Sequence, residues 1–327
     1  MNFLRRFTIA AVAVAGILLT CVPGLTQAQQ KYPVKPIRLV LAFGPGSATD
    51  IMSRLIATHI SETWGQPIVY ENRVGAGGSL AAAIVAKATP DGYTLLGTSA
   101  AFPITAALRT DLTYDSTKDF AGVSEIGYGT GVIIASPSLG VKSVAELVAL
   151  AQAKPGFLLF GTAGAGSGTH MSAERFKFAA GIKAQHVAFK GQPEFIIELM
   201  AGRVHFASSG LTVALPFIRD GKLTALVVNR PDRSPLLPDV PSIPEVVPGW
   251  GRDGALAWLA PAGTPLEIRD RISEAMRRAL AQPDVKDRLD KLGFQATPTT
   301  PQEHEKNLRA DIAAFTKIGR QIGLRQK

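Results

Sequence analysis

The residues best suited to chemistry in this 327-residue chain lie in two glycine-rich turns, one in each half of the sequence. At the first, an apolar run from Ile37 to Phe43 stops at Gly44-Pro45-Gly46, passes through Ser47-Ala48-Thr49-Asp50 and resumes with apolar residues at helical spacing. This pattern predicts a strand, a turn and a helix start. Because the first N–H groups of a helix lack internal partners and lie at the positive end of its dipole, such a turn suits an anion.

The first turn also has a simpler interpretation. Most strand-turn-helix joints are tight connections, and here Thr49 or Asp50 would serve as the helix N-cap. A Gly-Pro-Gly turn has too little specificity to decide between the two interpretations.

The second turn strengthens the anion-binding interpretation. An apolar strand expected at 157–160 runs into a glycine-rich stretch from Gly161 to His170, and a helix is expected from there through Phe178. An apolar strand, a glycine-rich turn and a hydroxyl residue at a helix start therefore occur twice. We interpret them as the two jaws of one anion site, with Ser47 to Thr49 as contacts and Asp50 as a structural cap.

Catalytic and metal-binding patterns are weak in comparison. Neither Ser47 nor Ser167 lies in a G-x-S-x-G motif. The third glycine of a dinucleotide-binding fingerprint is missing after Gly75-x-Gly77 and after Gly164-x-Gly166. We therefore expect no enzyme activity and no cofactor.

The five histidines are scattered and have no metal-ligand spacing, so no metal site is expected. We expect His59 and His304 on solvated helix surfaces, and His186 and His205 as structural residues within strands. His170 follows the second turn, and whether it faces a ligand stays open at this point.

The N-terminus predicts export. Arg5 and Arg6 precede an apolar stretch from Phe7 to Leu19 and a segment with small residues up to Ala28, which is typical of a signal peptide over 1–28 cut near Ala28. That apolar stretch is too short to span a membrane. Whether the route is Sec or twin-arginine stays open. Cys21 is the only cysteine, so the mature chain would have no disulfide.

The charge of the chain narrows the possible partners. Without Arg5 and Arg6 the formal charge falls from +9 to +7. A basic surface attracts nucleic acid, anionic membranes or small anions. Since no Lys or Arg run exceeds two residues and aromatic residues are sparse, we expect no nucleic-acid partner.

The remaining pattern is that of an α/β protein with two domains. Strands are expected at 68–70, 94–98, 132–135, 157–160, 184–189, 204–207 and 223–228, with helices between many of them. Residues 230–248 are expected to form a proline-rich surface excursion. Capping boxes are expected at Ser143, Thr264 and Thr300, the last two opening the first and last of three C-terminal helices.

Several motifs, found in order along nearly the whole mature chain, resemble the Bug family of extracytoplasmic substrate-binding proteins, which serve tripartite tricarboxylate transporters. They include Phe43-x-Pro45-Gly46-x-x-x-Asp50, Glu71-Asn72-Arg73-x-Gly75-Ala76-Gly77-Gly78, Pro90-Asp91-Gly92-Tyr93, Lys118-Asp119-Phe120, Phe189-Lys190-Gly191, Leu237-Pro238-Asp239-Val240-Pro241 and Ala260-Pro261-Ala262-Gly263-Thr264-Pro265.

The resemblance implies a two-lobed α/β Venus-flytrap fold of the periplasmic-binding-protein type II class, with two crossing strands and the ligand between the lobes. Carried onto this chain, lobe one is 29–128 plus 254–327 and lobe two is 129–253. A small carboxylate, either a di- or tricarboxylate or an aromatic acid, would be held by backbone N–H groups and hydroxyls. The implied ligand-binding residues are Phe43, Gly44, Ser47, Ala48, Thr49, Ser99, Gly164, Ala165, Ser167, Gly168, Thr169, His170, Ala188, Phe189, Gly191, Ser208 and Ser209.

The resemblance also implies a periplasmic monomer that delivers its ligand to the membrane subunits of a tripartite tricarboxylate-type transporter. Two alternatives remain: an exported hydrolase using Ser167 and His170, and a binding protein that presents its ligand to a sensor. Gly44 replaces a residue that is often proline in the family, and Ser208-Ser209 replaces a stretch that commonly contains Asp. Which carboxylate is bound does not follow from the sequence.

Overall fold

The computed structural model describes residues 32–247, 254–291 and 293–324. The expected signal peptide lies outside the described residues. By its internal contacts the chain divides into Met1–Val34 and Lys35–Lys327, and the architecture below is that of the second unit.

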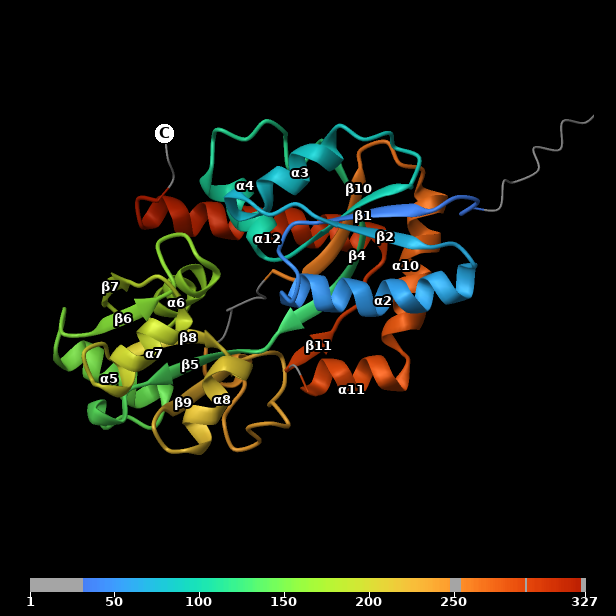
Figure 1. The fold of residues 1–327 in the computed structure, drawn as a ribbon. Coiled ribbons are helices and arrows are strands. Elements are labelled where there is room, and N and C mark those ends of the chain that lie inside the picture. The colour runs from blue at the N-terminus through green and yellow to red at the C-terminus, as the bar shows by residue number, and fades with distance from the viewer. Residues whose placement is uncertain (1–31, 248–253, 292, 325–327) are drawn as a thin grey trace, which may run out of the picture. The chain divides into compact units, whose positions relative to one another are not determined.

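The first sheet has six strands in the order β11-β4-β10-β3-β1-β2. Strands β1 (Ile37–Leu41), β2 (Ile68–Asn72) and β3 (Thr94–Thr98) run parallel. Strand β10 (Leu256–Pro261) is antiparallel to both β3 and β4 (Phe120–Gly129), and β11 (Phe294–Ala296) is antiparallel to β4. The sheet therefore combines an N-terminal parallel half with strands from the C-terminal part of the chain (Figure 1).

The second sheet has five strands in the order β7-β6-β8-β5-β9. Strand β6 (Leu159–Thr162) runs parallel to β7 (Gln185–Ala188) and β8 (Phe206–Gly210), and β5 (Gly131–Ala135) is antiparallel to β8 and β9 (Thr224–Asn229). Both sheets bring the carboxyl ends of parallel strands and the glycine-rich turns that follow them to one edge.

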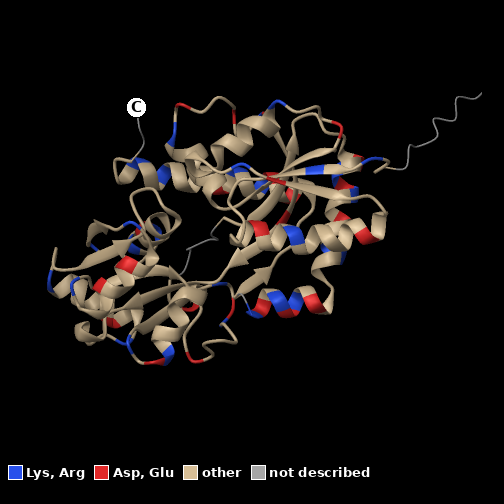
Figure 2. Ribbon diagram, viewed as in Figure 1, with Lys and Arg blue, Asp and Glu red and all other residues tan. Residues whose placement is uncertain are grey.

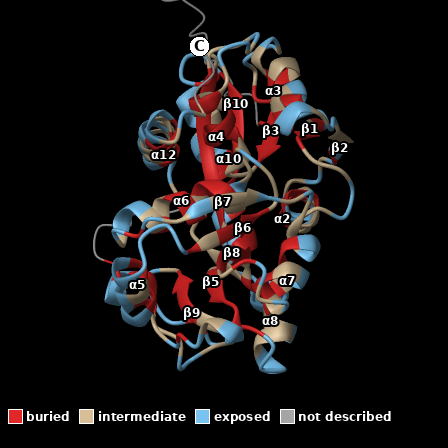
Figure 3. Cartoon of the chain, turned by 90° about the vertical axis from the view of Figure 1, so that its left-hand side faces the viewer, coloured by how far each residue is buried: buried red, intermediate tan, exposed pale blue. Residues whose placement is uncertain are grey.

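Helices cover both sheets, and buried residues concentrate on the strands (Figure 3). The helices of the first sheet are α2 (Ala48–Trp64), α3 (Ser79–Ala86), α4 (Ala101–Leu108), α10 (Leu266–Leu280), α11 (Pro283–Lys291) and α12 (Pro301–Gln321). Those of the second are α5 (Val144–Ala153), α6 (Gly168–Ala179), α7 (Gln192–Met200), α8 (Leu211–Arg219) and the short α9 (Ile243–Val246). None of the helices among the described residues is long and apolar enough to cross a membrane.

Strand β5 shows how alternation builds a core on each face of the second sheet. Ile133 and Ala135 pack in the cluster that includes Phe176 of α6, while Val132 and Ile134 pack in the cluster that includes Phe195 of α7. Because successive side chains of a strand point to opposite faces, four apolar residues in a row serve both layers.

The chain passes from the first sheet to the second at Thr130, between β4 and β5. The Thr130 N–H donates to the Gly293 carbonyl at 2.8 Å, and its carbonyl accepts from the Leu211 N–H at 2.8 Å. Sheet membership is compatible with the lobes expected from the sequence, and their boundaries at 128 and 254 stay a prediction.

Several local expectations were wrong. The helix expected to open with a Thr264 capping box begins at Leu266 with Pro265 as its N-cap, because the Thr264 hydroxyl donates instead to the Pro261 carbonyl at 2.8 Å. His304 is 3% exposed, so it does not lie on a solvated surface. The capping box at Thr300 is confirmed. At Ser143 only the hydroxyl half of the box is formed, because Glu146 accepts from Lys142 and not from the N-cap.

Candidate ligand-binding cleft

The first glycine-rich turn is closed by its own polar groups. Ser47 is the N-cap of α2, and its hydroxyl accepts from the Asp50 N–H at 3.2 Å. The Asp50 carboxylate accepts from the Gly46 N–H at 3.0 Å. The N-cap is thus neither Thr49 nor Asp50, so the expectation that Asp50 caps the helix was wrong; its carboxylate instead closes the turn by accepting from Gly46.

The second turn has the same construction. Ser167 is the N-cap of α6 and its hydroxyl accepts from the His170 N–H at 3.2 Å. The Nδ1 atom of His170 accepts from the Gly166 N–H at 3.0 Å, just as Asp50 accepts from Gly46. His170 is 3% exposed and closes the loop, so its ring has the structural role of Asp50.

The sequence contains a signal for this equivalence. The two turns read Gly44-Pro45-Gly46-Ser47-Ala48-Thr49-Asp50 and Gly164-Ala165-Gly166-Ser167-Gly168-Thr169-His170. Gly, Gly, Ser and Thr recur at the same spacing, and the last position supplies the acceptor for the second glycine. Gly46 and Gly166 both have left-handed φ angles, +81° and +74°, which glycine adopts without strain.

Asp50 anchors its turn to a neighbouring strand. It is 4% exposed and accepts from Arg54 Nε at 2.7 Å and from Asn72 Nδ2 at 3.0 Å, while Asn72 also donates to the Phe43 carbonyl at 2.7 Å. Burial alone would raise the pKa of Asp50, but hydrogen bonds from Asn72, Gly46 and Arg54 outweigh it and lower the pKa below its ordinary value.

A buried ionic cluster supports the second turn. The His170 ring stacks on His186 at a centroid distance of 3.8 Å, and its Nε2 atom lies 3.7 Å from Glu174 Oε1. Lys177 Nζ lies 2.8 Å from the same oxygen. Burial would raise the pKa of Glu174, but His170 and Lys177 outweigh that effect and lower it. The Ser167 hydroxyl accepts from the His170 backbone N–H and lies 3.0 Å from Thr169 Oγ1, while the His170 Nδ1 atom accepts from the Gly166 N–H. The two side chains therefore do not form a serine–histidine nucleophile pair.

A cavity of about 340 Å³ lies where the two turns and the crossing at Thr130 meet. The first sheet and its helices contribute mainly apolar side chains to its lining, which we call the apolar wall: Ile104, Leu256, Phe294 and Phe315. On that side the hydrogen-bonding side chains are Ser99, whose hydroxyl accepts from the Ala101 N–H at 3.2 Å, and Tyr128. Ala48, in the first turn of α2, also lines the cavity.

The second sheet and its helices contribute hydroxyl and amide side chains, which we call the polar wall. Apart from these side chains and several glycines, the described lining on this side includes Val213. The polar wall consists of Thr130, Thr169, Ser172, Gln192, Ser208, Ser209 and Thr212. Among the described lining residues no side chain is a carboxylate, an ammonium, a guanidinium or an imidazole.

Gln192 is a cleft residue that the sequence analysis missed. Its Oε1 atom accepts from Ser209 Oγ at 2.8 Å and from the Gly210 N–H at 3.0 Å. These two bonds fix the orientation of the amide, so its Nε2 donors are left without a partner among the described residues. The sequence signal available was its place at the first position of a helix, directly after Gly191.

The structure brings only some of the sequence-predicted site residues to this cavity. Ala48, Ser99, Gly168, Thr169, Ser208 and Ser209 line it. Four others are outside the lining: Ser47 and Ser167 are helix N-caps, and Thr49 and His170 are buried. The others that are outside the lining are Phe43, Gly44, Gly164, Ala165, Ala188, Phe189 and Gly191.

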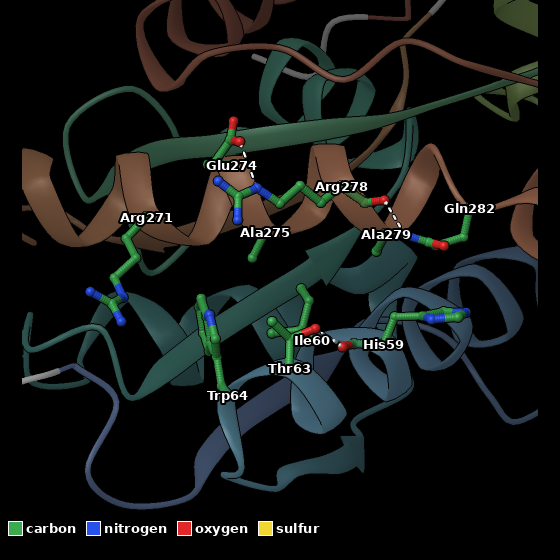
Figure 4. A pocket seen from close by; sticks show the side chains of 10 residues that line it. All are labelled: His59, Ile60, Thr63, Trp64, Arg271, Glu274, Ala275, Arg278, Ala279 and Gln282. Carbon is green, nitrogen blue, oxygen red and sulfur yellow. Dashed lines mark hydrogen bonds and ion pairs between the residues drawn. The ribbon is translucent and has the colours of Figure 1, made fainter.

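A second cavity, of about 330 Å³, lies between α2 and α10 (Figure 4). His59 and Trp64 of α2 line one side of it, and Arg271 and Arg278 of α10 line the other. Glu274 there already pairs with Arg278 at 2.8 Å, and charged pairs of this kind cover α10 and α11 (Figure 2). No glycine-rich turn reaches this cavity, so the first one is the better candidate site.

The histidine stack predicts a pH dependence of stability. Burial, together with the neighbouring His170, lowers the pKa of His186 to about 4, below the unfolded value of about 6.5. As the pH falls below about 6.5 the unfolded chain binds the proton first, so the free energy of unfolding is expected to drop by about 1 to 2 kcal/mol between pH 7 and pH 5. Urea unfolding at both pH values measures this drop.

The variant His186→Gln should show a shallower drop than the wild type. Some dependence should remain in His186→Gln, since burial also lowers the pKa of His205. Equal drops in wild type and His186→Gln would contradict the assignment.

Two α/β sheets with glycine-rich turns at the carboxyl ends of their strands, facing one cavity, define the class of two-lobed binding proteins with a type II Venus-flytrap fold. Residues 52–324 match the family model described as "Tripartite tricarboxylate transporter family receptor", and the chain belongs to that family. It is 30% identical over 301 residues to protein BugT of Bordetella pertussis, covering 90% of this chain and 92% of that one.

Solved structures agree with this assignment. The chain is similar to Rpa4515 of R. palustris with adipate, with 32% identity, a TM-score of 0.71 and coverage of 89% of this chain and 98% of that one. It is also similar to MatC from Rhodopseudomonas palustris with bound malate, with 31% identity, a TM-score of 0.66 and coverage of 88% and 99%. The resemblance to the Bug family and the expected fold class are thereby confirmed.

Proposed function

We propose that this protein is a periplasmic receptor that captures a small carboxylate in the cavity at Thr130 and presents it to the membrane subunits of a tripartite tricarboxylate-type transporter. The observation that carries the proposal is the pair of matched turns, each of which places the first turn of a helix, at Ala48 and at Gly168, on one cavity. Capture needs no covalent step, so the protein acts as a binding protein without catalysis.

The free donors around the cavity support carboxylate binding. The N–H groups of Ala48 and Gly168 belong to first helical turns, where no internal acceptor exists. The hydroxyl of Thr130 is buried without a partner among the described residues. A carboxylate accepts several such bonds, and charge-assisted bonds are each worth roughly 1.5 to 3 kcal/mol.

The export and partner expectations belong to the same proposal. The segment 1–28 would direct the chain to the periplasm and be removed near Ala28, leaving a monomer. Solved relatives carry adipate and malate, which are dicarboxylates. The family description supports a transporter as the recipient of the ligand.

A thermal-shift panel tests the binding function. Acetate, hexanoate, adipate, malate, citrate and benzoate would each be added at millimolar concentration to the mature protein. A ligand at a hundredfold excess over its Kd should stabilise the fold by about 2.7 kcal/mol. The matched methyl esters and amides, which lack the charge, should not.

The Ser208 side chain lines the cavity. The variant Ser208→Ala should lower the affinity for the best ligand about tenfold, which corresponds to the loss of one hydrogen bond of about 1.4 kcal/mol. Ser138→Ala, at an exposed serine after β5, is the matched control and should bind as wild type. If none of the carboxylates raised the melting temperature, the proposal would be wrong.

A further inference from the structure

The two walls of the cavity differ in kind. Seven hydrogen-bonding side chains come from the second sheet, its helices and the crossing at Thr130. The first sheet and its helices supply four large apolar side chains and two hydrogen-bonding ones, Ser99 and Tyr128. On the apolar wall, Ile104 and Phe315 are 5% and 2% exposed and pack together, and the Phe294 ring lies against Gly129. A ligand that fits this cavity must therefore be polar at one end and apolar at the other.

The free hydrogen-bond donors are more numerous on the polar wall, since the first sheet and its helices contribute only the Ala48 N–H and the Ser99 hydroxyl to the described lining. Those of the polar wall are the Nε2 group of Gln192, the Ser208 hydroxyl and the Thr130 hydroxyl, none of which has a partner among the described residues. Thr130 and Ser208 are 3% and 4% exposed, so water cannot replace a missing partner freely. Together these groups offer four N–H and O–H donors. The two oxygens of one carboxylate offer about four acceptor sites, so the donors match one carboxylate.

A second carboxylate would meet the apolar wall. There it would lose hydration against Leu256, Phe294 and their neighbours, and no cationic side chain of the described lining would compensate. An alkyl or aromatic group in the same place gains affinity, roughly fourfold for each methylene removed from water.

We infer that the ligand is an amphipathic monocarboxylic acid, with its carboxylate on the polar wall and an alkyl or aromatic body on the apolar wall. This inference rests on the proposed carboxylate-binding function and narrows its substrate class. Both turns still bring the first turn of a helix to the cavity, while the side chains around them divide into the polar wall and the apolar wall.

Matched acids test the inference by isothermal titration calorimetry. Hexanoate and adipate differ by one carboxylate on the same carbon chain, and benzoate and terephthalate differ in the same way on a ring. Each monoacid is expected to bind at least tenfold tighter than its diacid, and acetate is expected to bind at least tenfold more weakly than hexanoate. Adipate binding as tightly as hexanoate, or tighter, would overturn the inference and leave the proposed function intact, whereas no binding by any acid would defeat the proposed function itself.

Variants separate the two walls. Phe294→Ala should lower the affinity for hexanoate and benzoate about tenfold and leave the affinity for acetate unchanged. Thr130→Val should lower the affinity for all three acids alike. Phe178→Ala, at a phenylalanine that is 42% exposed on α6, is the matched control and should change none of them. Since the Thr130 hydroxyl has no partner in the described structure, Thr130→Val should keep its melting temperature, which separates lost binding from lost folding. An equal effect of Phe294→Ala on acetate and hexanoate would also overturn the inference.

Discussion

Replacing Gly127 by alanine is expected to lower the free energy of unfolding by about 3 to 5 kcal/mol, because the new methyl group has no room. Gly127 lies in β4 with a φ of +150°. A Cβ atom there would overlap the carbonyl oxygen of Gln295 and lie 2.9 Å from its carbonyl carbon, and both are backbone atoms of β11 that no rotamer change can move.

The same substitution should disturb ligand binding. Ala296 of β11 pairs with Gly127, and Phe294 of the apolar wall lies two residues before it on that three-residue strand. Moving β11 away from β4 would shift the Phe294 ring out of the cavity. Urea unfolding followed by circular dichroism measures the stability, and titration with the best acid of the panel measures the binding.

Gly221→Ala is the matched control for Gly127→Ala. Gly221 also has a positive φ, +68°, but nothing lies within 4 Å of the added Cβ. Its free energy of unfolding should fall by only about 1 kcal/mol, because the backbone strain of an alanine at this φ is the only cost. If Gly127→Ala were as stable as this control, the close packing of β11 on β4 would be disproved.

Replacing Asp50 by alanine is expected to cost about 3 kcal/mol of stability and at least tenfold in ligand affinity. The carboxylate accepts from Gly46, Arg54 and Asn72, and it is 4% exposed. Its removal leaves three donors without their acceptor. It also frees the turn that places Ala48 on the cavity.

Asp50→Asn should be intermediate, because the amide keeps one acceptor oxygen and loses the charge that Arg54 contacts. Asp220→Ala removes an exposed carboxylate whose ion pair with Lys222 is solvated, so it should stay within about 0.5 kcal/mol of wild type. Urea unfolding measures the stability of the three variants, and calorimetric titration measures their ligand affinity. Undiminished affinity in Asp50→Ala would mean that the first turn does not need this anchor to bind ligand.

Much of the secondary structure follows from local sequence. The expected strand at 94–98 is β3, Thr94–Thr98, and the amphipathic face of the first closing helix is buried at Ile272, Met276 and Leu280. Such patterns are readable because the alternation or the helical period lies within one element.

Strand β4 did not show in the sequence, although it is ten residues long. Its sequence is rich in glycine and contains Ser124 and Glu125, both buried. The Ser124 hydroxyl donates to the Thr299 carbonyl at 2.9 Å, and Glu125 accepts from Asn307 Nδ2 at 3.2 Å. Partners more than 170 positions away thus make a polar stretch into an inner strand, and no local pattern records them.

Helices α4 and α8 were missed for a related reason. Each contains a proline, Pro103 and Pro216, which lowers the expectation of a helix. Pro103 lies in the first turn of α4, where its missing N–H costs nothing. Packing of Ile104 and Leu108 against Phe315 holds the helix, and Phe315 lies more than 200 residues away.

The sequence by itself determined that this chain has two similar turns at helix starts, because the apolar strand, the glycines and the hydroxyl residue that mark each turn are neighbours in the chain. It did not identify Ser47 and Ser167 as the N-caps. Only the tertiary structure decided which residues of those turns reach the ligand: Ala48, Gly168 and Thr169 line the cavity, while Ser47, Ser167 and His170 hold the loops closed. The contrast between the polar and apolar walls was also decided there. It depends on bringing Gln192 and Ser208 opposite Phe294 and Phe315, and contacts between residues so far apart arise only when the whole chain has packed.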